Sequence, residues 1–339
     1  MKQRNEVVDI AKGIGIILVV VGHIASSSFD AIISIIYLFH MPLFFFLSGF
    51  YCKTNKSFIQ FFSDKGCRLL IPYIIYLFAQ TIVMDIIIFA SYKNIEEIKG
   101  IFLSFHPLAI WFLISLFTCN ILHWINSRLK FPPPPLLAIV TGVLGCGMVC
   151  SKLDLPCCLS QSLLAYPFFY IGDVAYNKIW GNNKRTIYGW LVNSRWNYIV
   201  LGIFSMALVF HPNIYTDMWS LTITSFVGCF VYALIGISVV IIASSIISQY
   251  KTISRYLSKI GVLSLHVMCL HCMIIKGAWL GVSIVAKRYY PWYDLNNPKG
   301  DVFLAVFVLV ITLVSSIYVA LWIDKRFGTL FNYKIEFKK

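Results

Sequence analysis

Long apolar segments follow one another along this sequence, separated by short polar stretches. A helix needs about 20 mostly apolar residues to cross a hydrocarbon core about 30 Å thick, and most of these segments reach that length. Charged residues make up 12% of the chain and hydrophobic residues 59%, a balance that would not cover a water-facing surface. We therefore predict an all-α integral membrane protein with about ten transmembrane helices, at residues 8–28, 31–51, 68–90, 108–127, 134–150, 161–180, 196–211, 220–247, 259–283 and 302–323.

The distribution of Lys and Arg between these spans predicts the orientation of the chain. Cytoplasmic loops of membrane proteins carry an excess of both residues. With the N-terminus in the cytoplasm, the inner segments hold 21 Lys and Arg and the outer segments hold 6. We expect both termini to be cytoplasmic and residues 1–339 to form a single transmembrane domain with no separate soluble domain. This arrangement explains the net charge of +14 without a nucleic acid partner, because the basic residues form no stripe with base-stacking aromatic residues.

Familiar motifs for metal, phosphate or nucleophile sites are missing from the sequence. We find no HExxH, no repeated CxxC, no Gly-rich phosphate loop and no nucleophile elbow. Most of the ten cysteines fall in apolar runs, where they act as small hydrophobic residues. A disulfide from Cys157 or Cys158 to Cys146 or Cys150 is conceivable in the predicted outer region. The sequence thus predicts no metal site and no bound cofactor.

The first span carries three ionisable residues, Asp9, Lys12 and His23. Such residues inside a membrane are costly unless they face a cavity or a partner, so each is a functional candidate. Lys12 and His23 are eleven residues apart, which places them within about 20° of one helix face and about 16 Å apart along the axis. One face therefore presents a cation near the cytoplasm and an imidazole toward the outer leaflet. Lys12 also has a structural interpretation, because it can extend to the inner headgroups and pair with Asp9.

The second span contains the run FHMPLFFFLSG at residues 39–49. Pro42 removes a helix hydrogen bond and is expected to kink the helix beside His40. By helix rise, His40 lies roughly 6 Å in depth from His23. Because the connection between the first two spans is short, we expect the helices to pack together and the two histidines to share a cavity. A structural role for His40 stays open.

The ninth span holds a serine and two histidines. Ser264 and His271 are seven residues apart and share a helix face, whereas His266 and His271 are about 140° apart around the helix. Three further ionisable residues are isolated and closer to span ends, and we interpret them as structural: Asp85, His123 and Asp173.

The inner loop before the third span ends in Lys65-x-x-Arg68, at the cytoplasmic mouth of that span. Cations at this position commonly bind lipid headgroups and fix topology. They equally suit a phosphate-bearing donor such as coenzyme A. The spacing by itself favours a role in binding lipid headgroups and fixing topology over a role in donor binding.

Together these motifs resemble the acyltransferase 3 family of membrane enzymes. The matches are Lys12 with His23, the run at residues 39–49 that includes His40, Pro42 and Ser48, and the Lys65-x-x-Arg68 element. Ile110-Trp111-Phe112-Leu113 is similar to the family's WFL signature, and Gly261-x-x-Ser264-Leu265 followed by His271 is similar to its G-x-x-S-L…H pattern. Lys12 stands where many members have Arg, which keeps the cation and loses the bidentate fork.

The resemblance implies an O-acyltransferase of the bacterial inner membrane. Its donor would be cytoplasmic acyl-CoA, acetyl-CoA above all, and its acceptor a hydroxyl of an envelope polysaccharide or of its lipid-linked sugar precursor. Lys12, Lys65 and Arg68 would then hold the donor phosphates, with membrane lipids around the protein. We hypothesise that His23 is the general base, with an acyl-histidine intermediate as the second variant. His40, Ser264 or His271 would complete the catalytic site, and Asp9, Pro42, Ser48 and Trp111 would support it.

A proton-coupled transporter or a flippase of a lipid-linked glycan is the competing interpretation. Ionisable residues inside spans are typical of such proteins as well. Many transporters consist of two halves with matching Gly/Pro-interrupted spans, and this sequence contains no such pair of halves. The motifs therefore favour the acyltransferase.

Overall fold

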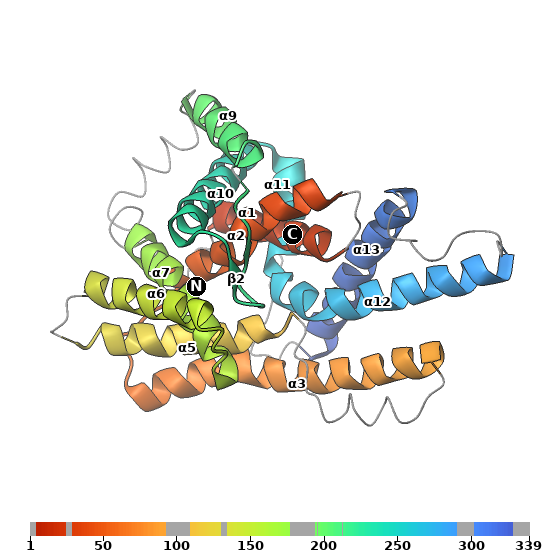
Figure 1. Ribbon diagram of the computed structural model, residues 1–339, viewed down its shortest axis with the longest axis horizontal. Helices are drawn as coiled ribbons and strands as arrows, with labels where there is room; N and C mark the ends of the chain where they lie inside the picture. Colours follow the sequence, from red (N-terminus) through yellow and green to blue (C-terminus); the bar gives the residue numbers. More distant parts are fainter. Residues whose placement is uncertain are drawn as a thin grey trace.

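The computed structural model describes residues 5–24, 29–92, 109–129, 134–176, 194, 196–211, 213–289 and 302–327. Almost all of these residues are helical, as Figure 1 shows. The elements are α1 (Glu6–His23), α2 (Asp30–Gly49), α3 (Phe58–Tyr92), α5 (Trp111–Asn126), α6 (Pro134–Cys150), the 3-10 helix η2 (Pro156–Cys158), α7 (Leu159–Val174), α9 (Trp196–Val209), β1 (Thr216–Asp217), β2 (Thr222–Ile223), α10 (Phe226–Ile247), α11 (Lys251–Val262), α12 (Ser264–Tyr289) and α13 (Val302–Phe327).

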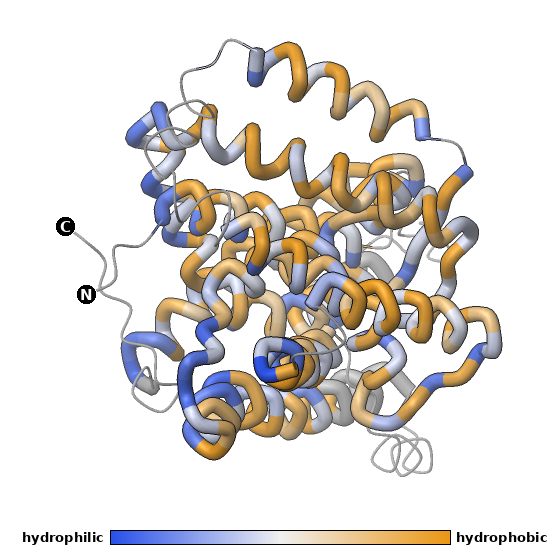
Figure 2. Tube along the Cα trace, turned by 90° about the vertical axis from the view of Figure 1, so that its left-hand side faces the viewer, coloured by the Kyte–Doolittle hydropathy of each residue, from blue (hydrophilic) through white to orange (hydrophobic). Residues whose placement is uncertain are grey.

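The chain is an all-α membrane protein, and its described residues form one very short pair of strands besides the helices. Five described helices are long and apolar enough to cross a membrane, within α2, α3, α10, α12 and α13. Three more, α5, α6 and α9, are apolar but shorter. In Figure 2, hydrophobic residues occupy the middle turns of most helices, and hydrophilic residues gather at the helix ends. Large apolar side chains such as Phe303 and Val227 are exposed, as expected for surfaces that face lipid. The number of ten spans and the cytoplasmic termini stay predictions.

Helix α1 lies at the centre of the helix assembly (Figure 1). It contacts α2, α10, α11, α12 and α13, and α2 in turn contacts α7 and α10. Its sequence explains this position, because apolar and small residues occur on every side of the helix and most are buried. The histidine at its end is therefore held inside the protein.

Two glycines allow α1 and α11 to approach each other closely. A Cβ atom added at Gly261 would lie 1.8 Å from the backbone oxygen of Asp9, and one added at Gly13 would lie 2.2 Å from the backbone oxygen of Leu257. At the start of both helices, the hydroxyl of Ser254 donates a hydrogen bond to the carboxylate of Glu6. This contact fixes α11 beside α1.

The predicted ninth span, residues 259–283, is wrong as one continuous helix. The chain breaks at Leu263, whose φ of −86° and ψ of 0° lie in the bridge region. Residues up to Val262 belong to α11, an amphipathic helix that packs on α1, and α12 begins at Ser264. The break occurs because α11 has polar residues along one face, and these residues would be unfavourable inside a membrane span.

Two other boundaries also differ from the prediction. Helix α3 starts at Phe58 rather than residue 68, because Phe61 and Leu69 are buried and anchor its first turns. Lys65 and Arg68 therefore lie on a helix and not in a loop. Helix α10 starts at Phe226 rather than at residue 220. Ser225 caps its N-terminus, because the Ser225 hydroxyl accepts a hydrogen bond from the backbone N–H of Gly228.

The segment before α10 forms an antiparallel hairpin. Thr216 pairs with Ile223 and Asp217 pairs with Thr222. The turn between the strands contains Leu221 with a positive φ of 53°. This hairpin contacts α2 and places its turn over the centre of the protein (Figure 1).

All ten cysteines are free thiols, and five of them are buried. The conceivable disulfide from Cys157 or Cys158 to Cys146 or Cys150 does not form. Four of the five buried thiols lie within hydrogen-bond distance of a polar atom, so they are not purely hydrophobic side chains: Cys52, Cys119, Cys229 and Cys272.

Candidate active site

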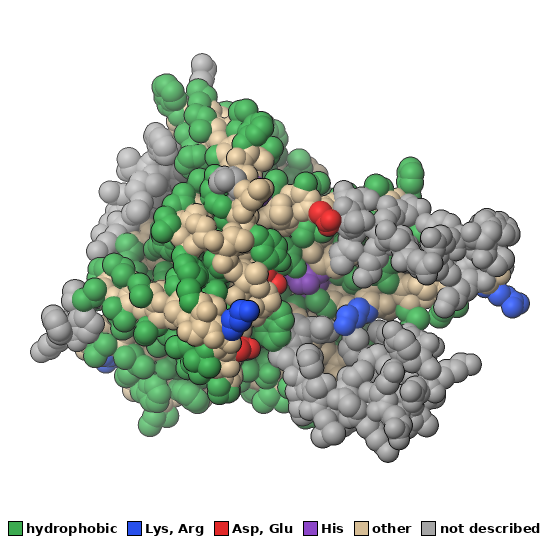
Figure 3. Space-filling view, viewed as in Figure 1, with side chains coloured by type: hydrophobic (Ala, Val, Ile, Leu, Met, Phe, Trp, Pro, Cys, Tyr) green, Lys and Arg blue, Asp and Glu red, His purple; other side chains and the backbone are tan. Residues whose placement is uncertain are grey.

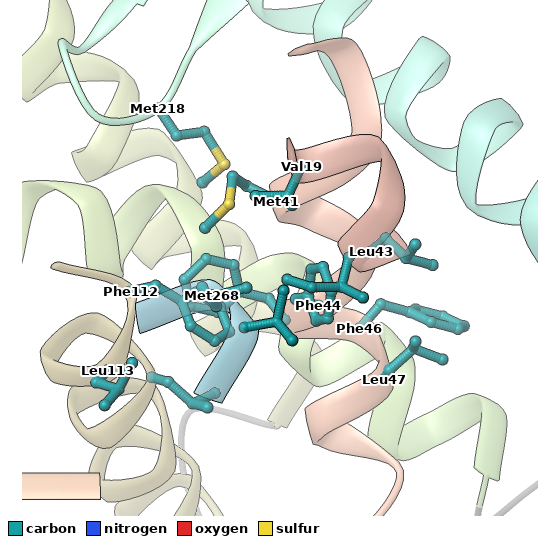
Figure 4. Close-up of a cluster of buried hydrophobic side chains, with 14 of the residues drawn as sticks. Val19, Met41, Leu43, Phe44, Phe46, Leu47, Phe112, Leu113, Met218 and Met268 are labelled. Carbon is teal, nitrogen blue, oxygen red and sulfur yellow. The ribbon is translucent and has the colours of Figure 1, made fainter. Parts of the chain in front are cut away.

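A cavity of about 250 Å³ lies where α1, α2, α5 and α12 meet beneath the β1–β2 turn. Part of its wall is apolar, formed by Val19, Met41, Met218 and Met268; in Figure 4 the first three lie above Phe44 and Phe112, and Met268 lies level with those two rings. The remaining lining is polar or aromatic: His23, Tyr37, His40, Ala109, Trp111, Asp217, Trp219 and Cys272. A histidine and an acidic side chain reach the surface together near the centre of the face in Figure 3.

Three histidines from three helices lie together here: His23 and His40 line the cavity, and His271 lies against His23. His23 is the last residue of α1, His40 lies in the middle of α2, and His271 lies in α12. The ring of His23 is 6.5 Å from the ring of His40 and 4.9 Å from that of His271, measured between centroids. His40 and His271 are buried, and His23 is partly buried. The structure thus brings together three of the four residues that the sequence places in the catalytic site.

Each of the three rings is held in the same way by its own helix. The Nδ1 atoms of His23, His40 and His271 lie 2.8, 2.9 and 3.1 Å from the carbonyl oxygens four residues earlier. A carbonyl only accepts hydrogen bonds, so Nδ1 carries the proton and Nε2 holds a lone pair in the neutral ring. This arrangement is natural for a helical histidine, whose side chain points back toward the preceding turn. In the neutral rings all three Nε2 atoms therefore carry the lone pair.

Cys272 adds a thiol to this group. Its Sγ lies 3.3 Å from Nε2 of the neighbouring His271, and the thiol can donate to that lone pair. No spacing rule in the sequence singles out a cysteine beside a histidine within an apolar helix. Its importance follows only from the position of His23 on the other side.

The β1–β2 hairpin covers the cavity with aromatic and acidic groups. Trp219 lies against Trp111, with ring centroids 5.9 Å apart, and Tyr215 stacks on Tyr37 at 6.3 Å and an interplanar angle of 15°. The Asp217 carboxylate accepts hydrogen bonds from two backbone N–H groups of the turn and so holds it. Burial, and then the Asp217 charge, raise the pKa of Tyr215, so its hydroxyl stays protonated.

Sequence reasoning missed the hairpin residues and Tyr37. Tyr37 lies three residues before His40 and so on the same helix face, a signal that was present in the sequence. Its ring centroid is 4.9 Å from that of His40. Asp217 and Trp219 had no such signal, because both belong to the loop predicted between the spans 196–211 and 220–247.

The other predicted residues lie around the cavity or away from it. Trp111 lines it, whereas Ser264 begins α12 and is not among the described lining residues. Helix α2 continues through Pro42, which lines a separate apolar groove of about 590 Å³ that shares Met218 with the histidine cavity. Ser48 donates to the Phe44 carbonyl at 2.7 Å.

The predicted donor-binding cations lie toward the other end of α1. The Lys12 ammonium is 5.4 Å from the centroid of the Tyr51 ring, just beyond α2. The Lys65 ammonium is 5.5 Å from the Phe61 ring, and Arg68 is exposed one turn further along α3. Asp9 lies one turn before Lys12, at the Gly261 contact.

His123 and Asp173, interpreted above as isolated, are in fact partners. His123 Nε2 lies 3.5 Å from Asp173 Oδ2, between α5 and α7. Both line a polar cavity of about 600 Å³ together with Lys53, Asn126 and Tyr170. The pair forms because α5 packs against α7, which sequence spacing does not reveal. The side chain of Asp85 lies outside the described residues.

Comparison with known proteins gives one match. A family model described as an acyltransferase domain matches residues 5–323, nearly the whole described chain. No curated protein and no solved structure matches.

Proposed function

This chain belongs to the acyltransferase family whose model spans residues 5–323, and we propose that it moves an acetyl group from cytoplasmic acetyl-CoA to a sugar hydroxyl. The acceptor would be an envelope polysaccharide or its lipid-linked precursor, in the bacterial inner membrane. Membership of the family makes the chain an acyl-transfer enzyme. Donor, acceptor and the roles of individual residues are proposals, and the histidine cavity supports them.

The observation that carries the mechanism is the lone pair on His23 Nε2. The Nδ1 proton of this ring is committed to the Val19 carbonyl at 2.8 Å, so Nε2 is the basic atom. The ring borders a cavity that has room for a thioester and a hydroxyl group. Among the three histidines, His23 is the one that is partly exposed, and His271 already accepts from Cys272. His23 is therefore the best placed general base.

The donor would reach this base along α1. Lys12 and His23 are about 16 Å apart along the axis, a span suited to an extended pantetheine arm. Lys12, Lys65 and Arg68 would hold the phosphates of the donor at the cytoplasmic end, since ammonium and guanidinium groups bind phosphate well. The thioester would then lie near the end of α1.

In the proposed reaction, His23 Nε2 takes the hydroxyl proton as the sugar oxygen attacks the thioester carbonyl. The carbon–sulfur bond then breaks, and the coenzyme A thiolate leaves with the proton returned by His23. An oxyanion forms in between and needs donors. His40 can donate from Nε2 only when it is protonated, because its Nδ1 proton is held by Ile36. The Tyr37 hydroxyl is a neutral donor from the same cavity, and Ser264 is a candidate at the start of α12.

A variant of this mechanism forms an acyl-histidine intermediate. The same Nε2 lone pair of His23 would attack the thioester, and the sugar hydroxyl would attack the acyl-imidazole in a second step. Both variants need His23, so they share the same first test.

That test follows transfer of label from radioactive acetyl-CoA into envelope glycan in membranes that contain the wild type or His23→Ala. We expect label with the wild type and a loss of about 10²- to 10⁴-fold in the variant, the usual contribution of a general base. His266→Ala is the matched control, because His266 is a buried histidine of α12 that bonds Tyr76, and neither residue is among the described lining residues of the cavity.

Persistence of label in His23→Ala at equal protein level would move the base to His40 or His271. Absence of label with the wild type would contradict the proposed donor or acceptor. Uptake assays would then test the transporter alternative.

A further inference from the structure

His23, His271 and Cys272 form a cluster that the acyl-transfer mechanism does not require in full. One nitrogen or sulfur atom of each residue lies within 4.8 Å of the other two. Cys272 has no part in the proposed reaction, and the sequence predicts no metal site. We propose that this cluster binds a divalent ion of the Zn²⁺ class and that the bound ion blocks the acyltransferase.

The ligand chemistry fits such an ion. Two imidazole nitrogens and one thiolate are a set that Zn²⁺ prefers, with Zn–N near 2.0–2.1 Å and Zn–S near 2.3 Å. Tetrahedral geometry then puts ligand atoms about 3.3–3.6 Å apart. Cys272 Sγ and His271 Nε2 are already 3.3 Å apart. The other ligand atoms lie within 4.8 Å of one another, so they need to close by at most about 1.5 Å to reach the tetrahedral spacing.

The hydrogen bonds behind the two histidines support this assignment. Metal-binding histidines almost always donate their other ring N–H to a carbonyl or carboxylate, which fixes the tautomer. Here His23 and His271 bond the carbonyls of Val19 and Val267 through Nδ1. Nε2 is thereby left as the metal-binding nitrogen of each ring, and Nε2 of His271 lies beside Cys272. The outer shell of a metal site is thus already in place.

The surroundings also suit a cation. His271 is fully buried and Cys272 is 8% exposed, so the ion would be largely shielded from water. The thiol loses its proton to solvent on binding, and the resulting thiolate offsets one positive charge. The Asp217 carboxylate lines the same cavity and provides a second negative charge. With three protein ligands the ion would keep a fourth position for one water, and two of those ligands, His23 and Cys272, line the cavity.

Binding would have a direct consequence for catalysis. The ion would occupy the Nε2 lone pair of His23, which is the atom proposed to take the acceptor's proton. Metal binding itself needs no donor or acceptor and can be measured without them. The metal site and the proposed acyl transfer can therefore fail independently.

The test uses the full chain in detergent, purified with a tag that contains no histidine and stripped with a chelator. Titration with Co²⁺ is expected to give about one bound ion per chain and a sulfur-to-cobalt charge-transfer band, which Zn²⁺ then abolishes by displacement. Cys272→Ser should lose the band, and both Cys272→Ser and His271→Gln should weaken binding by roughly 100-fold or more, since even second-shell changes cost about 10- to 100-fold. Cys269→Ser is the matched control, because Cys269 is fully buried one turn earlier on α12 and is not among the described lining residues.

X-ray absorption of the Zn²⁺-loaded wild type tests the site without any substitution. One sulfur near 2.3 Å together with nitrogen ligands near 2.0–2.1 Å would support it. A spectrum without sulfur, failure to retain the ion, or an unchanged cobalt band in a folded Cys272→Ser protein would overturn it. The cluster would then be an ordinary thiol–imidazole hydrogen bond.

Discussion

At the scale of single residues, the site depends on polar side chains whose hydrogen bonds are arranged by their own helices. His23, His40 and His271 each bond a carbonyl four residues earlier, so the helix sets which nitrogen is basic. Tyr37 lines the same cavity as His23 and His40, and its hydroxyl is a neutral donor. A base and a donor in one cavity are what acyl transfer to a hydroxyl needs.

Tyr37→Phe tests the donor. The ring would keep its stack on Tyr215, but the hydroxyl that can stabilise the oxyanion would be gone. We expect kcat to fall by about 100-fold, the usual loss for one oxyanion donor, while the protein level stays the same. Steady-state rates of acetyl transfer measure this effect.

Tyr215→Phe is the matched control, because it removes the hydroxyl on the other side of the same stack and Tyr215 is not among the described cavity-lining residues. Equal losses in the two variants would show that the stack matters and the Tyr37 hydroxyl does not.

At the scale of elements, close packing of α1 and α11 holds the central helix in place. Gly13 and Gly261 face backbone atoms of the partner helix with no room for a side chain. Small residues of this kind let membrane-protein helices approach closely and gain van der Waals contact. Because His23 is the last residue of α1, its position depends on this contact.

Gly261→Ala is expected to destabilise the protein by about 1–3 kcal/mol, the usual cost of overpacking. The added Cβ would meet the Asp9 carbonyl oxygen at 1.8 Å and push α11 away from α1. A lower midpoint of thermal unfolding in detergent, relative to the wild type, would show this destabilisation. Gly281→Ala in α12 is the control, because nothing lies within 4 Å of the position its Cβ would take. A midpoint for Gly261→Ala equal to that of the control would contradict the packing argument.

At the scale of the whole molecule, the orientation predicted from Lys and Arg places η2 outside the cell. Cys157 in this short helix is exposed, whereas Cys158 is partly buried. Burial, helped by Asp154 and Cys157, raises the pKa of Cys158 to about 11. The two neighbouring thiols therefore report both the side of the membrane and the local environment.

A membrane-impermeant maleimide added to intact cells is expected to label Cys157 first. Alkylation requires the thiolate, so labelling of Cys158 should be slow at neutral pH and rise about tenfold per pH unit as pH approaches the pKa. Peptide mapping by mass spectrometry after labelling between pH 7 and 9 measures both rates. Cys67, on the predicted inner side of α3, is the control and should react only after the cells are opened. Labelling of Cys67 but not Cys157 in intact cells would reverse the orientation.

Much of the fold followed from local patterns. An apolar stretch of spanning length forms a helix wherever it stands, because the backbone must satisfy its own hydrogen bonds in lipid. The segment at residues 134–150 therefore matches α6, and 302–323 matches α13 within its C-terminal turn. The predicted boundaries failed where buried residues extend a helix beyond its apolar stretch, at the start of α3, and where the amphipathic helix α11 ends at Leu263.

The sequence alone determined the membrane class, the family motifs and the candidates His23, His40 and His271, since each depends on composition or on spacing within one helix. Only the tertiary structure decided which helices are neighbours, because membrane helices are apolar on the faces toward lipid and toward protein alike. Packing of α1 against α12 brings His23 to His271 and Cys272, and the hairpin brings Asp217 over them. No local pattern carries that information, since these residues come from distant parts of the chain and meet through buried contacts.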